Sequence, residues 1–304
     1  MKLGFVSAIL DGWTFEEMMD TAAGLGYECV EAACWPQGKA ERRYAGVSHI
    51  DVDNDSREYV NHIHETCKKT GVEISALAYY PNTMDGDFQK REAAIRHLKK
   101  VIAFSEKLGV GMVTTFVGRD QTKSVEENLE AFGRIWPPII RYAEEHGVRI
   151  AIENCPMLFG REQWPGGQNL MCTPQLWRAV FDVLPSKYLG LNYDPSHFVW
   201  QMMDYISPLY EFRDRIFHVH FKDIKLYPDH LAQAGVLAYP LEYMQPKIPG
   251  LGDVDWGRFV SALTDIGYDG YACLEIEDHA FEGTPERVRA SLRLSKRYIE
   301  QFVI

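Results

Sequence analysis

The feature that most constrains the fold is a junction that recurs five times, in which a helix-type segment ends in glycine and strand-forming residues follow directly. The glycines are Gly26, Gly71, Gly109, Gly147 and Gly267. A glycine just past a helix can adopt the left-handed conformation that ends the helix, because it has no Cβ. Each junction therefore predicts the end of one helix and the start of the next strand.

Between these junctions the sequence alternates short apolar runs with longer helical segments. Strands are predicted at residues 3–7, 27–32, 72–78, 111–116, 148–153, 188–193, 216–221 and 270–275. Segments such as 15–25, 91–108 and 125–146 carry apolar residues three and four positions apart, with charged residues on the other face, as helices do. Pro137 and Pro138 are expected to kink or split the last of these helices.

Near-continuous apolar strands that alternate with helices are typical of a parallel sheet covered on its outer face. We predict an α/β fold in which residues 1–304 form one (β/α)8 TIM barrel, with long loops after the fifth and seventh strands. A doubly wound open sheet is the alternative. The stretch "GFVSAILDGW" around the first strand lacks a glycine-rich phosphate loop, which disfavours a dinucleotide-binding version of that sheet.

The charge balance excludes some classes of partner. The sequence has 32 Lys and Arg against 43 Asp and Glu, a net charge of −11, which disfavours nucleic acid and anionic membranes as partners. The one basic cluster, Gly38 to Arg43, is diluted by Glu41 and is interpreted as a solvated loop. The six cysteines form no CxxC pair, and no signal peptide or membrane-spanning run is evident. We therefore expect a cytoplasmic protein with reduced thiols.

The ends of the last four strands carry metal-binding side chains. In a TIM barrel the active site lies at the carboxyl ends of the strands, where this sequence places Glu153, Asp194, His218 with His220, and Glu275. Each has an ordinary interpretation: a helix cap for the aspartate, a core histidine, and paired or solvated glutamates. Three buried carboxylates that converge need a cation, however. We predict that Glu153, Asp194, His220 and Glu275 bind one divalent metal ion.

Three carboxylates and one imidazole suit Mn²⁺, Co²⁺ or Mg²⁺ better than structural Zn²⁺, although Zn²⁺ can also be accommodated. An octahedral ion with these four ligands keeps two positions for substrate oxygens, such as the adjacent hydroxyl and carbonyl of a sugar. The ion would act as a Lewis acid and stabilise an ene-diolate, while a carboxylate removes the neighbouring proton. Trp35 and Tyr79, at the ends of earlier strands, suit a wall that stacks on a sugar.

The motifs "IEN", "NYDPSH", "HVH", "PGLGDVDW" and "GYDGYACLEIE" together resemble the sugar phosphate isomerase/epimerase superfamily of xylose isomerase-like TIM barrels. The resemblance covers most of the chain and is closest to the ketose 3-epimerase branch, which includes tagatose and psicose epimerases. It implies that Glu153 and Glu275 are both metal ligands and proton-transfer groups on opposite faces of the substrate carbon. It also implies that His197 contacts the substrate.

Three features depart from the epimerase pattern. The Arg that precedes the Pro-Gly element is replaced by Gln245-Pro246-Lys247, and Phe159 stands where a second Glu follows the strand-five Glu. The segment from Lys222 to Ile248 is also longer than the epimerases need. Because substrate choice in a barrel depends on its loops, these changes bear on the substrate more than on the metal. Candidates for the missing contact to substrate oxygens are Lys222, Lys225, Lys247 and Arg161.

Several functions are therefore weighed. The first is a metal-dependent sugar isomerase or epimerase with a small carbohydrate substrate. The alternative is a metal-dependent lyase or dehydratase that acts on a keto-sugar, inosose or 3-keto-glycoside, because the same enolate can expel a β-substituent. An endonuclease IV-like nuclease needs extra histidines where Tyr79-Tyr80 and Thr115-Phe116 stand, and a non-catalytic barrel would not need paired carboxylates. A homo-oligomer, dimer or tetramer, is expected, with a partner subunit allowed for a lyase.

Overall fold

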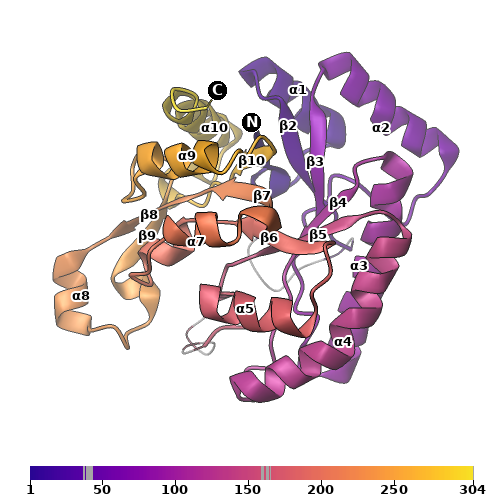
Figure 1. Ribbon diagram of the computed structural model, residues 1–304. Helices are drawn as coiled ribbons and strands as arrows, with labels where there is room; N and C mark the ends of the chain where they lie inside the picture. Colours follow the sequence, from indigo (N-terminus) through magenta and orange to yellow (C-terminus); the bar gives the residue numbers. More distant parts are fainter. Residues whose placement is uncertain (37, 39–43, 159–160, 162–163, 165, 304) are drawn as a thin grey trace.

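The barrel predicted from the sequence is present. The computed structural model describes residues 1–36, 38, 44–158, 161, 164 and 166–303, so Phe159 and most of the basic cluster, residues 39–43, lie outside the described residues. Eight strands close into a barrel in the order β1-β10-β7-β6-β5-β4-β3-β2, with helices around it (Figure 1). The open-sheet alternative is thereby excluded.

The barrel strands fall within two residues of their predicted bounds. They are β1 (Lys2–Val6), β2 (Cys29–Ala33), β3 (Glu73–Ala78), β4 (Met112–Thr115), β5 (Arg149–Glu153), β6 (Leu189–Tyr193), β7 (Ile216–Phe221) and β10 (Tyr271–Leu274). All neighbours pair in parallel, and β1 pairs with both β2 and β10. Closure in this way leaves no exposed sheet edge in the barrel and brings every strand's carboxyl end to one rim.

The helices begin and end where the local sequence signals predict. The main ones are α1 (Phe15–Leu25), α2 (Arg57–Thr70), α3 (Phe88–Leu108), α4 (Val125–Glu145), α5 (Pro174–Val183), α9 (Trp256–Asp265) and α10 (Pro285–Ile299), with short α6 (Ser196–Val199) and α7 (Ser207–Glu211). The junction glycines all have positive φ, from 64° at Gly147 to 74° at Gly26. The left-handed helix ends predicted from the sequence are therefore confirmed.

Pro137 and Pro138 lie inside α4 and do not split it, so that part of the prediction was wrong. Phe132 and Trp136 before the pair and Ile139 after it are all buried in the same core. Because both halves of the helix bury apolar side chains in that core, tertiary packing outweighs the local loss of helix hydrogen bonding.

The loop after β7 forms a small subdomain beside the rim. β8 (Asp223–Leu226) pairs antiparallel with β9 (Met244–Lys247), and between them lie α8 (Pro228–Ala234) and a 3-10 turn at Pro240–Glu242. Figure 1 shows this hairpin and α8 projecting from the lower left of the barrel. The hairpin is the structural form of the insertion noted in the sequence.

The loop after β5 packs against this hairpin. A buried cluster contains Trp200, Ile224, Tyr243 and Met244, and Trp164 of the β5 loop packs against it. The indole of Trp164 also donates a hydrogen bond to the carbonyl of Leu237 at 2.8 Å. The two long loops are therefore joined over the same side of the barrel.

Asp223 fixes the "PGLGDVDW" segment to the end of β7. Its buried carboxylate accepts five hydrogen bonds, from the backbone N–H groups of Ile224, Gly250, Gly252 and Val254 and from the indole of Trp256. Burial raises the pKa of Asp223, and these hydrogen-bond donors oppose the shift by stabilising the anion. The segment is thus held next to the strand that carries His220.

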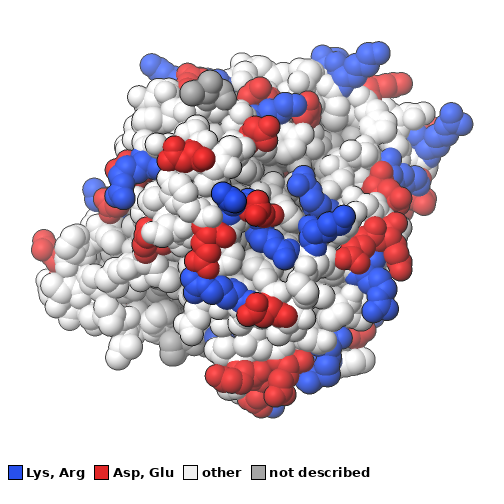
Figure 2. All heavy atoms as spheres, viewed as in Figure 1, with Lys and Arg blue, Asp and Glu red and all other residues white. Residues whose placement is uncertain are grey.

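The surface has no concentration of one charge sign on the face seen in Figure 2, where Lys and Arg are interspersed with Asp and Glu. Over the part of the chain that the structure describes, no helix combines the length and the apolar character needed to cross a membrane.

Candidate metal centre

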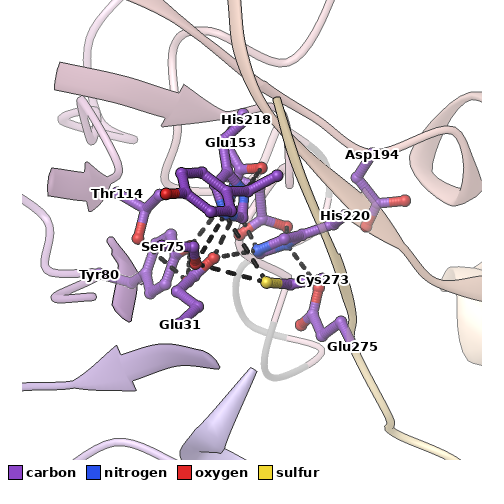
Figure 3. Close-up of polar contacts among 12 residues, drawn as sticks. Glu31, Ser75, Tyr80, Thr114, Glu153, Asp194, His218, His220, Cys273 and Glu275 are labelled. Carbon is purple, nitrogen blue, oxygen red and sulfur yellow. Dashed lines mark hydrogen bonds and ion pairs between the residues drawn. The ribbon is translucent and has the colours of Figure 1, made fainter. Parts of the chain in front are cut away.

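The rim of the barrel brings together the four side chains predicted as metal ligands. Glu153 ends β5, Asp194 follows β6, His220 lies in β7 and Glu275 follows β10. One potential ligand atom of each lies within 4.8 Å of the others. Glu153, Asp194 and His220 are buried, and the side chain of Glu275 is 17% exposed. Figure 3 shows His220 with the carboxylates of Glu153 and Glu275 near it and Asp194 beyond it.

Asn154 aligns the ends of β5 and β6. Its Oδ1 accepts a hydrogen bond from the backbone N–H of Asp194 at 2.8 Å, and its Nδ2 donates to the Asp194 carbonyl at 2.9 Å. This two-point contact substitutes for the backbone ladder just past the strands. It fixes the position of Asp194 relative to Glu153.

Three atoms in the centre lack hydrogen-bond partners although they are buried. They are Glu153 Oε1, Asp194 Oδ2 and His197 Nε2. His197 Nε2 lies 3.4 Å from the glutamate oxygen and 3.2 Å from the aspartate oxygen. Unpartnered buried carboxylate oxygens are costly, and a divalent cation would satisfy them. The donor set thus fits a bound metal ion.

The other oxygen of Asp194, Oδ1, accepts the backbone N–H of Ser196, the first residue of α6, at 2.7 Å, although the N-cap position of that helix is Pro195. A bond to the backbone near the start of α6 and a bond to a metal ion would therefore use different oxygens of this aspartate. A carboxylate held in this way presents its second oxygen in one direction only, towards Glu153 and His197.

The two histidines of β7 have different surroundings. His220 Nδ1 lies 3.1 Å from Glu275 Oε2 and 3.9 Å from Glu153 Oε1. Burial lowers the pKa of His220, but the nearby carboxylates of Glu31, Glu153 and Glu275 outweigh this and raise the pKa well above its usual value. His218 instead lies 3.0 Å from Asn192 Oδ1 and 3.1 Å from Ser75 Oγ, as a satisfied core histidine does.

The glutamates of the centre have pKa values moved in opposite directions. Burial raises the pKa of Glu153, but the imidazoles of His197 and His220 reverse the effect and lower it. Burial raises the pKa of Glu275, and the opposing effect of Lys222 does not cancel it. Two nearby carboxyls with divergent pKa values are an arrangement suited to an acid and a base.

Lys222 supplies positive charge beside this pair. Its buried ammonium lies 3.1 Å from Glu275 Oε1 and 2.5 Å from Glu277 Oε2. Burial lowers the pKa of Lys222, whereas Glu275 and Glu277 raise it, and the net effect is a pKa well above the usual value. The lysine is therefore a fixed cation at the rim.

The other residues predicted to contact substrate are less central. Trp35 and Tyr79 pack edge to face with ring centres 4.9 Å apart, and Tyr79 is only 5% exposed. Lys247 Nζ lies 3.6 Å from Asp278 Oδ1. Arg161, one of the further candidates, is exposed and pairs with Glu242 at 2.6 Å. Of the predicted contacts, the structure brings His197 and Lys222 next to the candidate metal ligands.

Sequence reasoning missed Glu31, which lies within β2 rather than at its end. Its carboxylate is fully buried and lies 2.7 Å from His220 Nε2. The hydroxyl of Tyr80, the neighbour of the predicted Tyr79, donates to Glu31 Oε1 at 2.5 Å. A charged residue inside the apolar run "CVEAA" was the available signal, because a buried charge needs partners.

The fold and the donor set define a TIM barrel with a carboxylate-rich rim. The chain belongs to the xylose isomerase-like TIM barrel family, whose family model matches residues 19–298. The family expected from the sequence motifs is thereby confirmed.

Two relatives extend over most of the chain. A Bacillus subtilis protein called YfiH is 27% identical over 338 residues, covering 99% of this chain and 100% of its own length. An inosose dehydratase from Lactiplantibacillus plantarum is 24% identical over 224 residues and covers 72% of each chain.

Solved structures share the fold over the whole chain. D-psicose 3-epimerase from Clostridium cellulolyticum H10, solved with D-tagatose, has a TM-score of 0.70 at 15% identity and covers 100% of this chain and 99% of its own. The IOLI protein with a bound zinc atom has a TM-score of 0.70 at 18% identity and covers 99% and 96%.

Proposed function

We propose that this protein is a divalent-metal-dependent isomerase or epimerase that acts on a sugar or sugar derivative. The observation that carries the proposal is the convergence of Glu153, Asp194, His220 and Glu275 within 4.8 Å, with buried oxygens that have no hydrogen-bond partner. Membership of a family with sugar-epimerase neighbours supports a carbohydrate substrate. A divalent cation held by these four side chains would supply Lewis-acid polarisation of a substrate carbonyl.

The proton transfer is assigned to the two glutamates. Glu153 removes the proton from the carbon next to the carbonyl, so a C–H bond breaks and an O–H bond forms on the carboxylate. Glu275 returns a proton to the opposite face of the same carbon, which inverts that carbon.

Two cationic or polar groups would hold the substrate oxygens. His197 Nε2 and Lys222 Nζ both lie among the carboxylates, and neither is exposed. We assign to Lys222 the role of the arginine that the epimerase pattern has before its Pro-Gly element. Trp35, Tyr79 and Lys247 are proposed to contact the substrate from the earlier strands and from β9.

A lyase or dehydratase is the second candidate, supported by the inosose dehydratase among the relatives. In that reaction the same proton is removed, the electron pair forms a C=C bond, and a β-hydroxyl leaves as water after it accepts a proton. In this reaction Glu275 would pass that proton to the leaving hydroxyl, and the ammonium of Lys222, 3.1 Å from Glu275 Oε1, would hold the substrate oxygen.

A substrate panel in D2O separates the two functions. Metal-loaded protein is incubated with ketohexoses, inososes and 3-keto-glycosides, and the products are identified by NMR. An epimer with deuterium at the inverted carbon supports the first function, and an unsaturated product or released aglycone supports the second.

Glu153→Gln and Glu275→Gln should each abolish turnover while the protein stays folded. Glu130→Gln, an exposed position on α4, is the matched control and should retain full activity. Near-normal turnover in either active-site variant would disprove the two-base mechanism. We also propose a homodimer or homotetramer, which light scattering after size-exclusion chromatography tests.

A further inference from the structure

Glu31 occupies an unusual place for a carboxylate. Glu31 lies in the middle of β2 and is fully buried. It is not adjacent in the sequence to any of the proposed metal ligands or proton-transfer residues. Its Oε1 accepts hydrogen bonds from the hydroxyls of Tyr80 at 2.5 Å and Thr114 at 3.0 Å. Its other oxygen, Oε2, lies 2.7 Å from His220 Nε2 and, at the longer distance of 3.6 Å, from His218 Nδ1 (Figure 3).

His220 therefore lies between two groups of carboxylates. Its Nδ1 faces Glu275 and Glu153, and its Nε2 faces Glu31. A neutral imidazole has one N–H and one lone pair, and only the nitrogen with the lone pair can bind a metal ion. When one ring nitrogen donates its N–H to a carboxylate, the other ring nitrogen keeps the lone pair and can bind the ion.

Asn192 competes for the same nitrogen, because its amide nitrogen lies 2.9 Å from His220 Nε2. An N–H bond to a carboxylate is roughly twice as strong as a bond between neutral groups. The shorter contact to Glu31 therefore places the proton on Nε2. The Asn192 amide is also engaged elsewhere, since it contacts the Tyr80 hydroxyl at 3.1 Å and His218.

Glu31, His218 and His220 are themselves close enough to hold a cation. Each of them, however, has hydrogen-bond partners, whereas the unpartnered buried atoms of the described residues include Glu153, Asp194 and His197 of the rim. The Glu31 carboxylate is thus already stabilised by hydrogen bonds inside the barrel, and it does not need a second ion.

We propose that Glu31 is a positioning residue that holds His220 in the tautomer with Nδ1 free to bind the metal ion. The proposal rests on the proposed metal centre and deepens it by assigning the group that orients its only imidazole ligand. Tyr80 and Thr114 form the next layer, because their hydroxyls fix the Glu31 carboxylate. Removal of such an outer partner typically weakens metal affinity by about 10–100-fold.

The test measures Zn²⁺ affinity by competition with a chromophoric chelator. Glu31→Gln should weaken Zn²⁺ binding by about 10–100-fold. Thr114→Val should weaken it by several-fold, because it removes one donor to Glu31 but keeps the side-chain shape. Thr115→Val is the matched control: it is the next residue, it is equally buried, and among the described residues its hydroxyl donates only to the carbonyl of Phe116. Its Zn²⁺ affinity should be unchanged within about twofold.

A second readout reports the tautomer directly. In the Zn²⁺-loaded protein with ¹⁵N-labelled histidine, the His220 ring should show a protonated Nε2 and a metal-bound Nδ1, with the signal assigned by its loss in His220→Asn. Glu31→Gln should shift or broaden this signal. A variant that merely loosened the barrel would not change the tautomer selectively.

The outcomes are distinguishable. If the unmodified protein binds no Zn²⁺, Mn²⁺ or Co²⁺, the proposed metal centre fails and this inference fails with it. If it binds metal but Glu31→Gln and Thr114→Val leave the affinity and the His220 signal unchanged, only the role of Glu31 is refuted. Should Glu31→Gln not fold, the comparison of Thr114→Val with Thr115→Val decides the question.

Discussion

Asp223→Asn is expected to destabilise the protein through the segment that follows the strand carrying His220. In the native protein Oδ2 accepts bonds from Gly250 N, Gly252 N and the Trp256 indole, and Oδ1 accepts bonds from Ile224 N and Val254 N. An amide has only one acceptor oxygen. In its best orientation the asparagine keeps the three bonds on one side and turns its NH2 towards the other two donors.

The size of the effect follows from those two donors. Each buried N–H left without an acceptor costs about 1–3 kcal/mol, so the variant should lose about 2–6 kcal/mol of unfolding free energy. That is a large fraction of the roughly 5–15 kcal/mol that stabilises a typical domain. Because Trp256 is buried and donates to Asp223, its fluorescence should report the loosened contact before global unfolding.

Urea unfolding followed by both tryptophan fluorescence and circular dichroism measures this change. Asp214→Asn is the control, because the Asp214 side chain is 92% exposed and its replacement should change stability by no more than about 0.5 kcal/mol. A loss below about 1 kcal/mol in Asp223→Asn would refute the view that this carboxylate holds the segment in place.

Two further predictions concern stability. Burial lowers the pKa of His49 to about 4, so at this residue the unfolded chain binds more protons than the native protein between that pH and about 6.5. The contribution of His49 to the unfolding free energy should therefore fall by about 2 kcal/mol from pH 7.5 to pH 5, and His49→Asn should remove that part of the slope in urea titrations. A Cβ at Gly250, where φ is +94°, would lie 2.7 Å from the Tyr298 ring, whereas at Gly12, where φ is +81°, it would meet nothing within 4 Å. Gly250→Ala should therefore lower the unfolding free energy by about 2–5 kcal/mol, and Gly12→Ala should lower it by about 1–2 kcal/mol, measured by thermal or urea unfolding. Equal losses in the two variants would show that only the backbone strain matters and not the contact with Tyr298.

The fold could be predicted because its signals are local. A glycine at the end of a helix, followed by an apolar run, shows where the next strand begins. This signal does not depend on residues that are distant in the sequence. The proline pair in α4 misled that reasoning, since the packing of Trp136 and Ile139 is a tertiary effect. The β8–β9 hairpin was also not predictable from local sequence. Strand β9 is short and contains Pro246, so its formation depends on tertiary contacts.

The site was predictable in outline because carboxylates at strand ends converge in a barrel. Glu31 escaped that reasoning, which considered only what each strand ends with. Its role depends on a contact with His220, 189 residues away in the sequence. Likewise, no local pattern shows that Tyr80 rather than Tyr79 reaches Glu31, since strand register and twist decide which side chain points inward.

The central claim is that the rim of the barrel binds one divalent cation through Glu153, Asp194, His220 and Glu275. The most direct test is the metal content of protein purified without chelator, measured by mass spectrometry and checked by titration of the stripped protein with Mn²⁺, Co²⁺, Mg²⁺ and Zn²⁺. We predict one ion per chain in the unmodified protein and in Asp214→Asn, and none in Asp194→Asn. No binding of any of these ions, or a stoichiometry that Asp194→Asn leaves unchanged, would contradict the claim.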